Sequence, residues 1–150
     1  SVQSYLVICR IAAEKLAEEL RARGFETRMW SRAGGLEGRR PTWEDTVGTC
    51  DLILYVANLQ TKSNQTVVRI EWAMPLGANC PNFVSAIPTA FVSFANPYHL
   101  LDAPRVQVYV NAYTATDDTV RAVAQKLTGE SAFRGTPPVD AFVGRWDTHL

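Results

Sequence analysis

The chain has 150 residues, of which 47% are hydrophobic, and its 15 basic and 15 acidic side chains give a net charge of zero. This length is sufficient for one well-buried core and too short for two. Surfaces that bind nucleic acid or acidic membranes gain their affinity from clustered positive charge, so the balanced charge argues against both. We therefore expect one globular domain.

Membrane segments and disulfides are not predicted. No stretch approaches the roughly 20 apolar residues of a membrane span, and the first ten residues lack the basic flank and cleavage site of a signal peptide. We expect a soluble protein, with the cytoplasm slightly favoured as its location. Cys9, Cys50 and Cys80 are widely spaced and form no CxxC pair, which favours buried thiols over a disulfide framework or a metal site.

The first forty residues have the pattern of a βαβ unit. Tyr5–Cys9 is a short apolar strand, and Ile11–Arg23 alternates apolar and charged residues at the spacing of an amphipathic helix. Gly24 is placed to end that helix. In Phe25–Trp30 the residues Phe, Thr and Met alternate with Glu, Arg and Trp, which predicts a second strand near a sheet edge.

Two connecting segments follow. Ser31–Pro41 is rich in glycine and arginine but lacks the spacing of a dinucleotide-binding or phosphate-binding loop, so it is interpreted as a surface connection. Thr42–Thr49 predicts a short helix, because Thr42 is a suitable N-cap and two carboxylates follow it in the first turn.

The stretch from Asp51 to Met74 is the centre of the predicted fold. Leu52–Ala57 is a continuous apolar run that predicts a strand buried on both faces. Asn58–Asn64 is a polar loop, and Asn64–Met74 predicts a helix because its apolar residues recur at helical spacing. Ligands of open α/β sheets bind at the carboxyl ends of the strands, so this loop is the first candidate site.

The second half of the chain continues the alternation. Leu76–Pro88 predicts an irregular connection, and Thr89–Ala95 a buried strand. Asn96 is a good N-cap for a short helix at Pro97–Leu101, since proline is favoured at the first helical position. Val106–Val110 predicts a further strand.

The last predicted helix is Thr116–Thr128, with a threonine cap, acidic residues in its first turn and a following glycine. Residues 129–150 are expected to form an irregular tail, which Phe133, Phe142 and Trp146 attach to the body of the domain. The alternation of strands and helices predicts the α/β class. The specific prediction is a three-layer α/β/α sandwich with a mostly parallel sheet of about five strands, as in flavodoxin.

No complete catalytic motif is present. The sequence has no GxSxG nucleophile elbow and no glycine fingerprint after the first strand, and its potential metal ligands are scattered. We therefore predict no catalytic residue, no metal and no cofactor. His99 and Asp102 are three residues apart, a spacing that favours a local structural hydrogen bond and leaves a catalytic dyad as the alternative.

Four segments between Asp51 and Asp147 resemble a known family when they are taken in order. They are DLILYVAN followed by SNQTVVRI, then IPTAFVSFANPYHLLDAP, VYVNAYTATDDTVRAVAQKLTGES and FRGTPPVD. In this order they resemble the C-terminal α/β domain of glycoside hydrolase family 3, in its β-N-acetylhexosaminidase branch. Residues 1–50 match this family only as a generic βαβ opening.

The resemblance implies that this domain is part of a larger enzyme. In that family an N-terminal (β/α)8 barrel of the same chain carries the aspartate nucleophile and, in this branch, a histidine–aspartate acid/base pair. In the β-glucosidase branch the acid/base glutamate lies on a loop that looks equivalent to Asn58–Gln65, which here contains no carboxylate. Retaining hydrolysis requires two carboxyl groups about 5 Å apart, so we expect residues 1–150 to be a non-catalytic domain.

The candidate contacts with an N-acetylhexosaminide substrate or with the barrel are Asn58, Lys62, Asn64, Asn96 and Tyr98. Capping and loop hydrogen bonds are the alternative role for these side chains. Two other functions stay open: a stand-alone flavodoxin-like module that binds a small ligand, and a structural or oligomerising domain. No nucleic-acid or membrane partner is expected.

Overall fold

The computed structural model describes residues 2–7, 10–29, 48–61, 63, 68–70, 72 and 84–144. The predicted surface connection at Ser31–Pro41 lies outside these residues. So does the predicted helix at Thr42–Thr49, except for its last two residues, which form part of a turn.

The strands form one sheet in the order β2-β1-β3-β4-β5, and each of the pairings is parallel. Their bounds are β1 (Val2–Val7), β2 (Thr27–Met29), β3 (Leu52–Ala57), β4 (Thr89–Ser93) and β5 (Val108–Asn111). This is the strand order of the flavodoxin type of doubly wound fold. The α/β class and the parallel sheet are therefore confirmed, and β2 lies at a sheet edge as its alternating pattern predicted.

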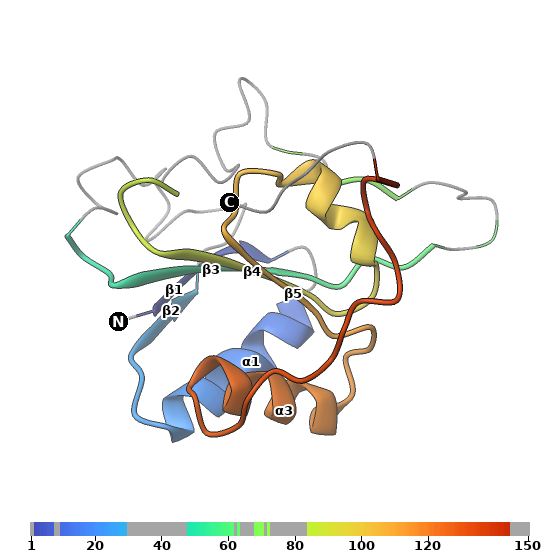
Figure 1. Cartoon of the computed structure of the whole chain (residues 1–150). Helices are drawn as coiled ribbons and strands as arrows, with labels where there is room; N and C mark the ends of the chain where they lie inside the picture. Colours follow the sequence, from blue (N-terminus) through green and yellow to red (C-terminus); the bar gives the residue numbers. More distant parts are fainter. Residues whose placement is uncertain are drawn as a thin grey trace.

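Helices flank the sheet on both faces (Figure 1). Helix α1 (Arg10–Ala22) and helix α3 (Asp117–Leu127) pack against each other on one face, and the 3₁₀ helix η1 (Pro97–Asp102) lies over the other. The capping signals acted as predicted. The Thr116 hydroxyl accepts a hydrogen bond from the Thr119 N–H, and the Asn96 side chain accepts one from the Tyr98 N–H.

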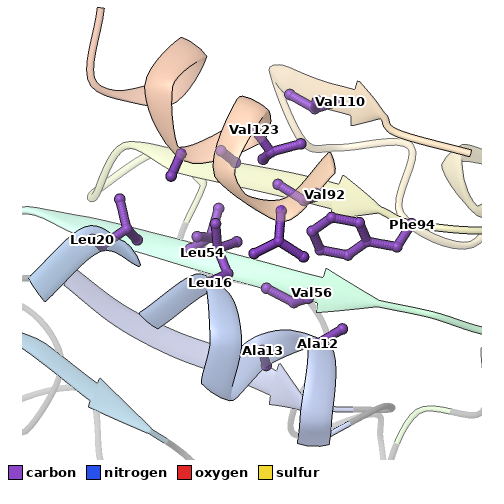
Figure 2. Close-up of a cluster of buried hydrophobic side chains, with 13 residues drawn as sticks. Ala12, Ala13, Leu16, Leu20, Leu54, Val56, Val92, Phe94, Val110 and Val123 are labelled. Carbon is purple, nitrogen blue, oxygen red and sulfur yellow. The ribbon is translucent and has the colours of Figure 1, made fainter. Parts of the chain in front are cut away.

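The first hydrophobic cluster fills the space between the sheet and the helices α1 and α3 (Figure 2). Side chains from β3, β4 and β5 meet the apolar stripe of each helix there. The labelled members are Ala12, Ala13, Leu16, Leu20, Leu54, Val56, Val92, Phe94, Val110 and Val123. The amphipathic pattern of α1 therefore decides which side of this helix packs against the sheet.

The second cluster lies on the opposite face of the sheet and is aromatic. The rings of Tyr55 and Phe91 are stacked with centroids 6.2 Å apart, and Phe91 stacks on Tyr109 at 5.2 Å. The ring of Trp72 meets Tyr55 edge-on at 6.1 Å. Because β3 contributes to both clusters, its continuous apolar sequence is explained, and the predicted burial on both faces is confirmed.

The helix predicted for Asn64–Met74 is wrong wherever this segment is described. Residues 68–70 and 72 have no helical structure. The Ile70 N–H donates to the Asp102 carboxylate at 3.1 Å, and the Trp72 indole N–H donates to the Asp102 carbonyl at 3.0 Å. The Ile70 N–H is thus bonded to the Asp102 side chain, whereas in a helix it would donate to a backbone carbonyl four residues earlier.

The start of β5 also differs from the prediction. Val106 was expected to open the strand, but its N–H donates to the Ala103 carbonyl in a turn, and its side chain is buried in the second cluster. The strand therefore begins at Val108. The strand β1 begins earlier than expected, at Val2 rather than Tyr5.

The tail is irregular over its described part, residues 129–144, as predicted. In Figure 1 it runs from the end of α3 towards the face of the sheet that carries η1. Phe142 is buried and attaches the tail as expected. Phe133 is 54% exposed and contacts the body of the domain at α3, where the Lys126 ammonium lies 5.7 Å from the centre of its ring. Trp146 lies outside the described residues.

The packing of α1 gives a stability prediction. Leu16→Ala removes a side chain that is 1% exposed, so it should lower the free energy of unfolding by about 2–5 kcal/mol. Ile11→Ala is the matched control on the same helix, because Ile11 is 66% exposed and its loss should cost less than about 0.5 kcal/mol. Urea denaturation followed by circular dichroism measures both. Equal losses would contradict this assignment of the buried face.

Candidate functional site

The carboxyl ends of β3, β4 and β5 meet at one edge of the parallel sheet. The segments that follow them enclose an open hollow of about 440 Å³. Its lining residues are Leu59, Gln60, Thr61, Ala95, Asn96, Pro97, Tyr98 and Tyr113. This is the edge at which open α/β sheets bind their ligands, so the topology and the hollow indicate the same candidate site.

The turn at Asn96 and Pro97 is held by the two strands beneath it. The Ser93 hydroxyl at the end of β4 donates to the Asn96 carbonyl at 2.6 Å. The Tyr109 hydroxyl on β5 donates to the Pro97 carbonyl at 3.2 Å. Burial raises the pKa of Tyr109 to about 12, so the phenol keeps its proton and remains a donor at neutral pH.

Two of the five predicted contact residues line the hollow. Asn96 and Tyr98 belong to its wall, and Tyr98 is 46% exposed. Asn58 directly follows β3 and is partly buried, but it is not a lining residue. Lys62 and Asn64 lie outside the described residues. The loop predicted from β3 therefore contributes to the hollow through Leu59, Gln60 and Thr61, and the contact role of all five predicted residues stays a prediction.

Tyr113 lines the hollow and was not among the predicted contact residues. It follows β5, and its side chain is 44% exposed. The rule that ligands bind beyond the carboxyl ends of strands would have selected it, had the rule been applied to β5 as well as to β3.

His99 and Asp102 form a buried structural pair. His99 is fully buried, and its Nδ1 lies 3.4 Å from the Asp102 carboxylate, whose side chain is 5% exposed. The same carboxylate accepts hydrogen bonds from the Arg69 guanidinium and the Ile70 N–H. The pair therefore fastens the segment containing residues 69 and 70 to η1, as expected for a local structural role.

Burial also sets the protonation state of His99. Burial lowers the pKa of His99 below its ordinary value of 6.5, and the Asp102 carboxylate opposes this shift only in part. Its Nε2 is buried and has no hydrogen-bond partner among the residues that the structure describes. The imidazole is consequently neutral at pH 7.

This protonation state predicts a loss of stability in mild acid. The unfolded chain takes up a proton at His99 near pH 6.5 while the folded chain does not, so the free energy of unfolding is fully retained above 6.5 and falls as the pH drops below it. Urea denaturation at pH 7.5 and 5.5 should show the loss, and the His99 imidazole resonance should titrate below pH 6.5. The outcome that contradicts this account is a titration of His99 above 6.5.

Neither a metal cluster nor a membrane span occurs in the described part of the chain. No group of three or more His, Cys, Asp and Glu side chains is placed there to hold a metal ion. None of the described helices is both long enough and apolar enough to cross a bilayer. Cys50 is buried, and this burial raises the pKa of its thiol; Cys9 and Cys80 lie outside the described residues.

Comparison with known proteins supports the resemblance seen in the sequence. No protein-family model matches the chain. A β-N-acetylglucosaminidase/β-glucosidase from Cellulomonas fimi is 48% identical over 139 residues, which are 93% of this chain and 25% of that protein.

Solved structures of larger enzymes also contain a region similar to this chain. β-Glucoside phosphorylase BglX aligns with a TM-score of 0.78 and 38% identity, over 99% of this chain and 26% of that one. A glycoside hydrolase family 3 β-N-acetylglucosaminidase from Paenibacillus sp. str. FPU-7 aligns over 93% of this chain and 27% of that one, with a TM-score of 0.61. At 19% identity, the latter shows the fold alone.

The chain spans about a quarter of the length of the relatives that it matches. Its own length is nearly fully covered by them, so the similarity concerns one region of larger proteins. The resemblance predicted from the four ordered segments is therefore confirmed: the chain is similar, over nearly its whole length, to the C-terminal α/β domain of glycoside hydrolase family 3.

Proposed function

We propose that the chain is the non-catalytic accessory domain of a family 3 enzyme of the β-N-acetylhexosaminidase kind. In this proposal the domain packs against an N-terminal (β/α)8 barrel of the same parent chain and contributes polar contacts to an N-acetylhexosaminide. The observation that supports it best is the 48% identity to a β-N-acetylglucosaminidase/β-glucosidase of which the chain covers 25%. The parent's catalytic machinery then lies in the remaining part.

The composition of the hollow supports the non-catalytic role. Of the described residues that line it, none is an aspartate or a glutamate. A retaining glycosidase needs two carboxyl groups about 5 Å apart, one as nucleophile and one as acid/base. The hollow offers amides, a hydroxyl and two phenols instead, groups that orient a sugar by hydrogen bonding without breaking its glycosidic bond.

The buried dyad does not replace the missing carboxylates. A general acid must come within about 2.6–3.2 Å of the oxygen that it protonates, directly or through one water. His99 is fully buried and Asp102 nearly so, and the Asp102 carboxylate already accepts hydrogen bonds from Arg69 and Ile70. In the proposal, His99 and Asp102 have a structural role beneath the site.

An assay of aryl N-acetylglucosaminide cleavage tests this division of labour. The isolated chain should release no aryl group, whereas the full-length parent should turn over the same substrate. Asn96→Ala in the parent should raise KM several-fold with a smaller effect on kcat, because the amide binds substrate without reacting. Turnover by the isolated chain that a single substitution in it abolishes would contradict the proposal.

A second candidate reaction is phosphorolysis, which the 38% identity to β-glucoside phosphorylase BglX favours. The same assay separates the two reactions if the parent is incubated with and without inorganic phosphate. A hydrolase releases the free sugar in both cases. A phosphorylase needs phosphate for fast turnover and yields the sugar 1-phosphate.

A further inference from the structure

Tyr113 has a backbone conformation that bulky residues rarely adopt. Its φ is 62°, in the left-handed region. The Thr114 N–H donates to the Ala112 carbonyl at 2.8 Å, which closes a three-residue γ-turn with Tyr113 at its centre. The form of this turn with positive φ is the strained one. A glycine or an asparagine would fit the position with less strain, yet the chain has a tyrosine there.

The strained turn is anchored to the same residue as the Asn96 turn. The Ala112 N–H donates to the Ser93 carbonyl at 2.8 Å, while the Ser93 hydroxyl donates to the Asn96 carbonyl at 2.6 Å. Ser93 thus fixes both segments at the end of β4. Strain of this kind persists when the surrounding structure holds it, and it occurs preferentially at ligand sites.

The side chain of Tyr113 remains partly exposed in this conformation and is not a member of either hydrophobic cluster. It is 44% exposed and lines the hollow together with Tyr98, which is 46% exposed. Packing in the hydrophobic core therefore does not explain why an aromatic ring is kept at a strained position. A half-exposed ring on a backbone that is held in place is suited to contact a ligand in the hollow.

The rest of the lining indicates the class of ligand. None of the described lining residues is charged, so none of these side chains would pair with a phosphate or a carboxylate. The Asn96 carbonyl oxygen Oδ1 accepts from the Tyr98 N–H, and its amide nitrogen has two donors for a ligand. Gln60 and Thr61 add further neutral hydrogen-bonding groups. Neutral polar groups beside aromatic rings fit a pyranose, which has hydroxyls at its rim and an apolar C–H face.

We propose that Tyr113 is the sugar-stacking residue of the hollow, with its ring against the C–H face of a pyranose of the substrate. Asn96 and Gln60 then meet the sugar hydroxyls. This inference deepens the proposed function and rests on it, because it takes the ligand to be a β-linked N-acetylhexosaminide. It assigns to Tyr113 a binding role and no part in the chemical step.

The test is a titration of the 150-residue chain with the β-1,4-linked disaccharide of N-acetylglucosamine, followed by amide NMR shifts. Tyr113→Phe keeps the ring and should bind within about twofold of the unchanged chain. Tyr113→Asn removes the ring and should raise Kd by about three- to tenfold. Its melting temperature should not fall, since asparagine tolerates a positive φ.

Val143 provides the matched control, because it is the other non-glycine residue with positive φ among those described, at 55°, and is 77% exposed. Val143→Asn should likewise not lower the melting temperature, and it should leave Kd unchanged. The absence of saturable shifts, or an equal Kd for Tyr113→Asn and the unchanged chain, would overturn the inference.

Cleavage by the parent is measured separately. An inactive parent refutes the proposed function, whereas an active parent with unaltered binding in Tyr113→Asn refutes only the role of Tyr113.

Discussion

The hydrogen bonds of the Asp102 carboxylate hold together the face of the sheet that carries η1. The carboxylate accepts hydrogen bonds from Arg69 and Ile70 and lies beside the Nδ1 of His99. The backbone carbonyl of Asp102 accepts a hydrogen bond from the Trp72 indole N–H. A buried carboxylate is costly unless it is paired and hydrogen-bonded. Asp102 therefore draws a segment some thirty residues away onto η1.

This arrangement determines where the hollow lies. The helix η1 begins at Pro97, so its position sets the orientation of Asn96 and Tyr98 at the carboxyl end of β4. Ser93 and Tyr109 hold the same turn from below through its two carbonyl groups. Asn96, Tyr98 and Tyr113 thus line the hollow from turns that the sheet holds, and the two tyrosines remain partly exposed, as in a pre-formed binding site.

Sequence patterns predicted the elements whose signals are local. The apolar run Leu52–Ala57 and the capped helix after Thr116 both appear where expected, because burial and capping are properties of neighbouring residues. The helix predicted at Asn64–Met74 is wrong at its described residues, 68–70 and 72, since side-chain spacing does not reveal a hydrogen bond from Ile70 to Asp102. Tyr113 was missed because its proximity to Asn96 depends on the pairing of β4 with β5.

In the proposed function, the domain contacts the sugar without cleaving its glycosidic bond. A structure of the full-length parent with a bound, non-cleavable N-acetylglucosaminide would test this division of labour. The sugar should contact Asn96, Tyr98 or Tyr113, and the acid/base beside the glycosidic oxygen should come from outside these 150 residues. A carboxylate of this chain within hydrogen-bonding distance of that oxygen, or a sugar far from the hollow, would contradict it.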